Sequence, residues 1–250
     1  MRKLILAGVL LYVFLVARDF PADVVAGWFV PEPVKVYGVS GSVWSGSAEA
    51  IDPGQAGSGL TLGATSWTIS PLWLLTARLR GTLSTQFDEG SRLNTAFSKP
   101  LIGKTLKLSK AQGILDLAAL PEPMRPNQVV GRVGLSFESL TLDAMWPVGA
   151  DGTVDLVNLN LTRPTSVELG SFEVVFSDAD DSEITGIVAD TDSEIEVEGT
   201  LSIKPDRSYF FTGSALAGPD ADSNVARSLP FLGIPDDSGR VALTYEGTIE

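Results

Sequence analysis

The sequence predicts a mainly β protein: a single curved antiparallel sheet, half-open like a groove or a taco, with an N-terminal transmembrane helix and few short helices. Three observations support this prediction. An apolar segment follows Arg2 and Lys3 at the start of the chain. Beyond Val30, apolar and polar residues alternate, which is typical of strands with one apolar face. Glycines recur inside the alternating runs, and an interior glycine indicates a kink, a bulge or a close backbone approach.

The first element is the segment from Leu4 to Ala17, which contains no charge. It is shorter than the roughly 20 residues that span a bilayer core, and its length also suits a cleaved signal peptide. No good cleavage site follows directly, and apolar residues resume between Ala22 and Val30. We therefore expect residues 1–29 to be an uncleaved membrane anchor and residues 30–250 to be an exported β-rich domain, with a cleaved signal as the alternative. The side chains expected to contact the membrane include Leu4, Leu6, Leu10, Phe14 and Leu15.

The composition is strongly acidic, with 18 basic and 31 acidic residues and a net charge of −13. Residues 1–30 hold three basic and two acidic residues, so the remainder carries −14. This balance argues against nucleic-acid binding and against docking on anionic lipid through a basic face. The chain has no cysteine and no histidine, which removes disulfides, Ser-His-Asp and Cys-His catalysis and most zinc, copper and iron sites. We therefore expect that the protein is not an enzyme and binds no cofactor.

Three long runs alternate most regularly and are expected to be strands: Leu75–Phe87, Ile195–Ile203 and Val241–Ile249. Shorter runs at Leu156–Leu161 and Phe172–Phe176 follow the same pattern. Each run places apolar side chains on one face and polar side chains on the other. The sheet is therefore expected to be covered on one side only.

Other segments interrupt the strands. The alternation in Gly131–Ala144 changes phase near Ser139, which predicts a β-bulge or a tight turn there. The proline-rich segment Leu120–Pro126 is expected to be a loop within one sheet; a linker between two domains is the alternative. Ser70–Leu75, with Pro71, suits a first helical turn or a bend, and Asp222–Gly233 could hold a short helix.

Two glycine-containing stretches carry a family resemblance. The first runs from Gly38 to Ala48, and the second closes the chain between Ser208 and Gly247. On these stretches the chain resembles the type II secretion system protein N family. The first stretch and Trp67–Leu72 are also similar to segments of AsmA-like β-groove proteins. The motif residues, candidates for packing or partner contact, are Gly38, Gly41, Trp44, Gly46, Gly213, Gly233, Tyr245 and Gly247.

The resemblance implies an accessory or assembly component of the type II protein secretion system in the bacterial inner membrane. Its amino terminus is expected in the cytoplasm and its body in the periplasm, in contact with other secretion-system proteins. No catalytic residues, metal or cofactor are implied. The AsmA-like alternative is a groove that binds lipid or transfers it between membranes. A closed core and a lipid groove have the same periodicity, so the pattern alone leaves both open.

Three further features each have two interpretations. Trp44 is expected to pack against the sheet, with an exposed partner contact as the alternative. The 11 acidic residues between Glu168 and Glu198 suit a solvated face or hairpin tips, and a basic partner or a cation site are the alternatives. The apolar block Leu229–Pro235 is expected to plug one end of the apolar face, although it could contact a membrane or a partner. Paired carboxylates are the only candidates for a hydrolase, which is the least favoured function.

Overall fold

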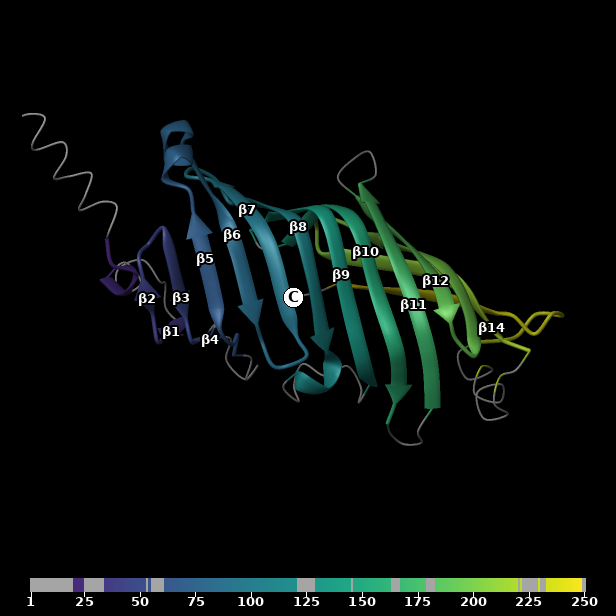
Figure 1. The fold of residues 1–250 in the computed structure, drawn as a ribbon. Coiled ribbons are helices and arrows are strands. Elements are labelled where there is room, and N and C mark those ends of the chain that lie inside the picture. Colours follow the sequence, from purple (N-terminus) through teal and green to yellow (C-terminus); the bar gives the residue numbers. More distant parts are fainter. Residues whose placement is uncertain are drawn as a thin grey trace, which may run out of the picture.

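The computed structural model describes residues 20–24, 34–52, 54, 61–120, 129–144, 146–162, 167–178, 183–219, 221, 229 and 233–248. These residues form a 13-stranded sheet in the order β15-β14-β13-β12-β11-β10-β9-β8-β7-β6-β5-β3-β2 (Figure 1). A small two-stranded sheet pairs β1 (Lys35–Tyr37) with β4 (Ala50–Asp52). The prediction of a mainly β protein with one large antiparallel sheet and few short helices is confirmed.

The large sheet is a meander, because strands that follow one another in the sequence are neighbours in space. Two short 3-10 helices, η1 (Pro71–Thr76) and η2 (Leu117–Ala119), lie between strands. The strands of the large sheet are β2 (Ser40–Gly41), β3 (Ser45–Ala48), β5 (Thr65–Ile69), β6 (Arg78–Gln86), β7 (Arg92–Pro100), β8 (Thr105–Asp116), β9 (Val129–Asp143), β10 (Trp146–Leu161), β11 (Val167–Asp178), β12 (Ile184–Asp192), β13 (Ile195–Ile203), β14 (Ser208–Ala217) and β15 (Val241–Thr248).

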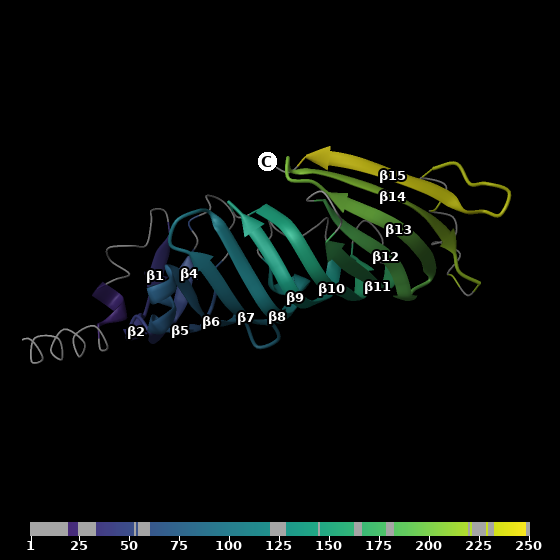
Figure 2. The ribbon, with the colours of Figure 1, turned by 90° about the horizontal axis from the view of Figure 1, so that it is seen from above.

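The sheet is curved and open, with β2 and β15 at its two edges. Seen from above, β13–β15 curl back over one side of the sheet (Figure 2). The anchor predicted for residues 1–29, with Leu4, Leu6, Leu10, Phe14 and Leu15, lies outside the described residues except for Phe20–Val24. Among the described residues no helix is long and apolar enough to cross a bilayer.

The strand predictions agree with the structure to within a residue at two of the three long runs. Ile195–Ile203 is β13, and β15 ends at Thr248, where the described residues also end. The third run was expected to start at Leu75, which is wrong, because β6 begins at Arg78. Pro71 opens a 3-10 helix that ends at Ala77 in the left-handed conformation, so Leu75 belongs to this helix. The predicted helical turn at Ser70–Leu75 is thereby confirmed.

The phase change in β9 is a β-bulge, as predicted. Ser139 pairs with Asp151 and Phe137 pairs with Gly152, so Glu138 is the additional residue on β9. The bulge returns the apolar residues on both sides of it to the same face of the sheet.

The proline-rich segment connects neighbouring strands of one sheet. β8 and β9 pair along their length, and Asp116 lies opposite Arg132. Residues 121–128 themselves lie outside the described residues, as does most of the helix predicted at Asp222–Gly233.

Aspartates order several hairpin turns by accepting backbone hydrogen bonds, the Asx-turn arrangement. The carboxylate of Asp236 accepts bonds from the amides of Ser238 (2.8 Å) and Arg240 (3.0 Å) and from the Ser238 hydroxyl (2.6 Å). The serine hydroxyl bond is the main cause that lowers the pKa of Asp236. Asp88 has a lowered pKa chiefly because the amide of Gly90 donates to it at 2.7 Å. A serine hydroxyl likewise lowers the pKa of Asp206.

Candidate functional site

The pairing register assigns each strand residue to one of two faces, because directly opposed residues project to the same side. One row crosses the sheet from β3 to β15, and we call the face that carries it the inner face. The opposite face is the outer face. The row contains no charged residue and consists of Ala48, Thr65, Thr85, Leu93, Gly113, Leu135, Val154, Val174, Val188, Gly199, Gly213 and Leu243.

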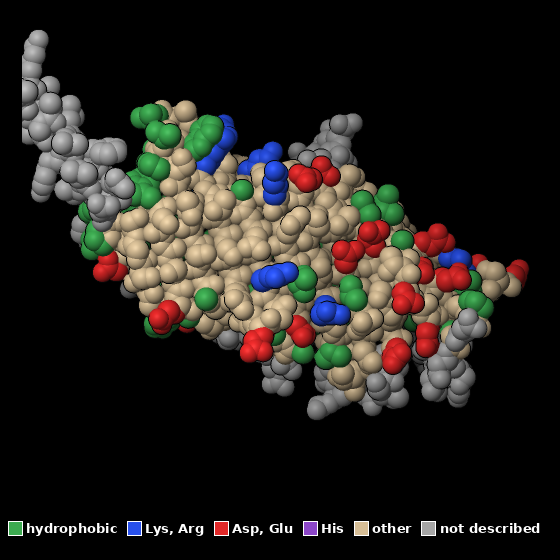
Figure 3. All heavy atoms as spheres, in the orientation of Figure 1, with side chains coloured by type: hydrophobic (Ala, Val, Ile, Leu, Met, Phe, Trp, Pro, Cys, Tyr) green, Lys and Arg blue, Asp and Glu red, His purple; other side chains and the backbone are tan. Residues whose placement is uncertain are grey.

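Burial separates the two faces. Most buried strand side chains, such as Ala48, Val174 and Val241, lie on the inner face. Outer-face neighbours such as Thr82 and Ile187 are exposed. The outer face seen in Figure 3 is largely polar and carries scattered charges. Because buried side chains gather on the inner face, we identify it with the concave side toward which β13–β15 curl in Figure 2.

The curvature of the large sheet shields part of the inner face, because β13–β15 curl back over it (Figure 2). Many of its large apolar side chains, among them Leu83, Phe97 and Leu135, are only half-buried. A cluster that excludes solvent forms at the C-terminal end, where Leu229 packs with Ala215, Val241 and Leu243. The prediction that the apolar block Leu229–Pro235 plugs one end of the apolar face is confirmed for Leu229 and is wrong for Ile234, which is 93% exposed.

Aromatic side chains lie across glycines of the neighbouring strand on the inner face. A β-carbon added at these glycines would lie 2.6–2.9 Å from the aromatic side chain opposite, closer than real contacts allow. Each ring thus occupies the space that a side chain would fill, which keeps the inner face shallow and apolar. The pairs are Gly46 with Trp67, Gly81 with Phe97, Gly152 with Phe137, Gly186 with Phe176, and Gly247 with Tyr209.

The first motif forms the N-terminal edge of the sheet. Gly38 (φ +62°) and Gly41 (φ +84°) adopt the left-handed backbone region that favours glycine. The ring that packs on this motif belongs to Trp67, whose Nε1 donates to the carbonyl of Val43 at 3.1 Å. Sequence analysis placed this packing role on Trp44. Trp44 itself is half-buried in the β2–β3 turn, and its role remains a prediction.

The closing motif lies on β14, β15 and the segment before β15. Gly213 faces Gly199 on the inner face, and the rings of Phe211 and Tyr245 stack at 6.5 Å. Gly233 lies beside Val241, where an added β-carbon would approach the valine to 2.9 Å. The structure therefore places Gly213, Gly233, Tyr245 and Gly247 in one region, at the opposite end of the sheet from Gly38–Gly46.

The described part of the acidic stretch lies on β11, β12 and β13 and in the connections beside β12, while Asp180 and Asp181 lie outside the described residues. Among the described residues, no group of three or more acidic side chains could hold a metal ion. Arg240 donates to Glu198 at 2.8 Å and lies 3.8 Å from Glu196. Glu196 and Glu198 of β13 therefore pair, across β14, with the side chain of Arg240, which lies in the segment that leads into β15.

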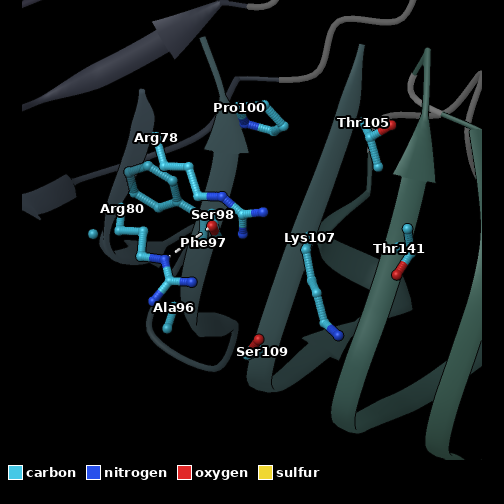
Figure 4. Close-up of a pocket in the computed structure, with 11 residues that line it drawn as sticks. Arg78, Arg80, Ala96, Phe97, Ser98, Pro100, Thr105, Lys107, Ser109 and Thr141 are labelled. Carbon is cyan, nitrogen blue, oxygen red and sulfur yellow. Dashed lines mark hydrogen bonds between the residues drawn. The ribbon is translucent and has the colours of Figure 1, made fainter. Parts of the chain in front are cut away.

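The outer face has a basic depression that sequence analysis missed. Its volume is about 560 Å³, and Arg78, Arg80 and Lys107 line it with the hydroxyls of Ser98 and Thr141 (Figure 4). Arg80 donates to Ser98 at 3.2 Å. The available signal was local: residues 76–110 contain many basic residues and few acidic ones, which the net charge of the chain conceals.

Comparison with known proteins extends over almost the whole chain. The family model for type II secretion system (T2SS), protein N, matches residues 32–244. A type II secretion system protein N from Aeromonas hydrophila is 27% identical over 241 residues, which cover 94% of this chain and 90% of the relative. A Vibrio cholerae protein of the same name is 24% identical and covers 88% of this chain and 87% of its own. No solved structure matches. The chain belongs to the type II secretion system protein N family.

Proposed function

We propose that this protein is a non-enzymatic accessory component of type II secretion, anchored in the bacterial inner membrane, whose periplasmic sheet contacts other secretion-system proteins. The family match over residues 32–244 carries this proposal. The chemistry agrees with it, because a chain without histidine or cysteine lacks the usual nucleophile–base pairs of hydrolases. The outer face offers broad polar surfaces for protein contact.

The described start of the chain supports close attachment of the sheet to an anchor. The amide of Val43 donates to the carbonyl of Phe20 at 3.0 Å, and Pro21 forms a bridge with Ser42. Ala22 is buried. Phe20 and Pro21, which belong to the proposed anchor segment 1–29, are thus joined to the edge of the sheet by backbone hydrogen bonds, an arrangement that would hold the body near the membrane surface.

A secretion assay tests the accessory role. Cells that lack this protein are expected to release less of a type II substrate into the medium while its periplasmic amount rises, and the full-length chain should restore release. The release of a protein exported by another route serves as the control. Unchanged release from cells without the chain would refute the proposal.

A second function, lipid binding on the inner face, is favoured by one observation. A continuous row of uncharged residues crosses the inner face from β3 to β15, and many of the large apolar side chains on this face are only half-buried. An acyl chain laid along it would cover apolar area that is otherwise in partial contact with water.

Two neighbouring residues of β6 provide a matched test. Leu83→Glu puts a charge on the inner face, and Thr82→Glu puts the same charge on the outer face. Native mass spectrometry of the gently extracted protein should find lipid on the wild type and on Thr82→Glu, and much less on Leu83→Glu. Wild-type protein without lipid, or equal lipid on both variants, would exclude this function.

A further inference from the structure

One rim of the sheet carries an exposed apolar tip. It consists of η1 and the turn between β7 and β8, which are joined by a hydrogen bond from the amide of Leu101 to the carbonyl of Ala77 at 3.0 Å. Large side chains that face solvent on this tip are Leu72 (73% exposed), Trp73 (40%), Leu75 (87%), Leu101 (58%) and Ile102 (91%). Leaving such side chains in water is unfavourable, so a cluster of them indicates a contact surface.

The local backbone explains why these side chains project outward. Pro71 begins a 3-10 helix of only six residues, which contains no buried residue. Ala77 ends it in the left-handed conformation, and the chain then turns directly into β6. The helix therefore stands beyond the end of the sheet and has no core to bury its leucines.

Basic side chains surround the tip. Arg78 and Arg80 begin β6, Lys99 is near the end of β7, Lys104 lies in the turn, and Lys107 is near the start of β8. Arg80 stacks on the ring of Trp73, with its guanidinium 3.9 Å from the ring centroid. We call these five residues the basic collar. Within the described ranges, none of them forms an ion pair with a carboxylate; the ion pairs there belong to Arg240.

Charge is thus segregated in a chain that is acidic as a whole. By strand register, the carboxylate closest to the basic collar is that of Asp143, which ends β9 opposite Thr105. Figure 3 shows hydrophobic and basic side chains side by side over η1, and acidic side chains mainly over the strands toward the C-terminus. The expectation that the chain has no basic face for anionic lipid fails at this rim, because a net charge averages over the whole surface.

We propose that the tip docks in the interface of an anionic bilayer, with Leu72, Leu75 and Ile102 among the acyl chains and the basic collar on lipid phosphates. Apolar side chains ringed by Arg and Lys, with an aromatic ring between them, match the layers of a membrane interface. A protein partner would have to supply an apolar pocket rimmed by acidic groups, whereas every anionic bilayer has an apolar acyl-chain layer bordered by a layer of negatively charged phosphates. η1 and Phe20–Val24 both lie toward the N-terminal end of the sheet (Figure 1). The docking goes beyond the proposed function.

Depth measurements on the full-length chain test this docking. The chain has no cysteine, so Leu75→Cys gives a single site for an environment-sensitive dye. Ile234→Cys is a matched control, because Ile234 is 93% exposed in the segment before β15 at the other end of the sheet. Each labelled chain is placed in vesicles of phosphatidylethanolamine and phosphatidylglycerol that contain lipids with a nitroxide on the acyl chain. We expect strong quenching of the dye at position 75 and little at position 234.

Charge variants separate bilayer docking from other contacts. Lys99→Gln and Lys104→Gln should each lower the ratio of docked to free tip roughly fivefold, whereas Lys204→Gln in the β13–β14 turn should not. Vesicles of phosphatidylcholine alone should give weaker quenching than anionic vesicles. Equal quenching at positions 75 and 234 would overturn the proposal. A dye at position 75 whose emission is blue-shifted but is not quenched by lipid nitroxides would also overturn it, because the tip would then lie against protein and not in the bilayer. Flotation of the vesicles measures separately whether the chain is anchored in the bilayer. A failure of anchoring and a failure of tip docking therefore give different results.

Discussion

Replacing Ile184 by alanine tests the assignment of inner and outer faces on a single strand, β12. Ile184 is 1% exposed on the inner face, whereas Ile187 is 59% exposed on the outer face of the same strand. Ile184→Ala removes three carbon atoms worth about 0.8 kcal/mol each in transfer from water. Because a cavity remains, we expect the free energy of unfolding to fall by about 2–5 kcal/mol. Ile187→Ala removes the same atoms from a hydrated position and should cost less than about 1 kcal/mol.

Urea unfolding of the full-length chain in mild detergent, followed by far-UV circular dichroism, measures both losses under identical conditions. Ile184→Val provides an intermediate step, with an expected loss of about 0.5–1.5 kcal/mol. The comparison depends on the difference between two isoleucines of one strand and is insensitive to the absolute stability. Equal losses for Ile184→Ala and Ile187→Ala, or a larger loss for Ile187→Ala, would refute the assignment of faces.

Three further predictions concern packing, charge and pH. Gly46→Val should destabilise the protein by about 1–3 kcal/mol, because the new side chain overlaps the ring of Trp67; urea unfolding would show it, and an unchanged midpoint would contradict the ring-on-glycine arrangement. Arg240→Gln should cost roughly 0.2–1 kcal/mol, and the cost should shrink in high salt; a salt-independent loss would contradict the ion pairs with β13. Asp236 has a lowered pKa in the folded state, so its stabilisation is present above its unfolded pKa of about 3.9 and is lost as the pH falls through the lower folded pKa. Asp236→Asn should therefore be less stable than the wild type near neutral pH and equal to it in strong acid, as urea midpoints across this range would show.

Local pattern was sufficient for much of the fold. Period-two alternation located β13 and most of β15, because the polarity of each strand residue indicates which face of the sheet it occupies, independently of the neighbouring strands. The phase change near Ser139 located the bulge in β9 for the same reason, since a flat strand cannot exchange its faces. The start of β6 was misplaced because Leu75 continues the alternation, while Pro71 imposes a helical turn that alternation does not register.

The site depended on contacts between distant residues, which one sequence does not reveal. Interior glycines were recognised as places of close approach, but the ring that approaches Gly46 belongs to Trp67, and only the register of β3 and β5 brings the two together. The apolar tip was missed because Leu72 and Ile102 lie on separate connections that meet only when β6 and β7 pair. Its basic collar was concealed by a net charge of −13.

Native mass spectrometry of the full-length chain tests whether this family member works as an anchored accessory protein of secretion. The chain is isolated in mild detergent from cells that make the secretion system, and its intact mass and bound molecules are read in one spectrum. We predict a mass that includes residues 1–19 and a complex with at least one other secretion-system protein. A chain that lacks these residues, or that carries no secretion-system protein while the other components still associate with one another, would contradict the anchored accessory role.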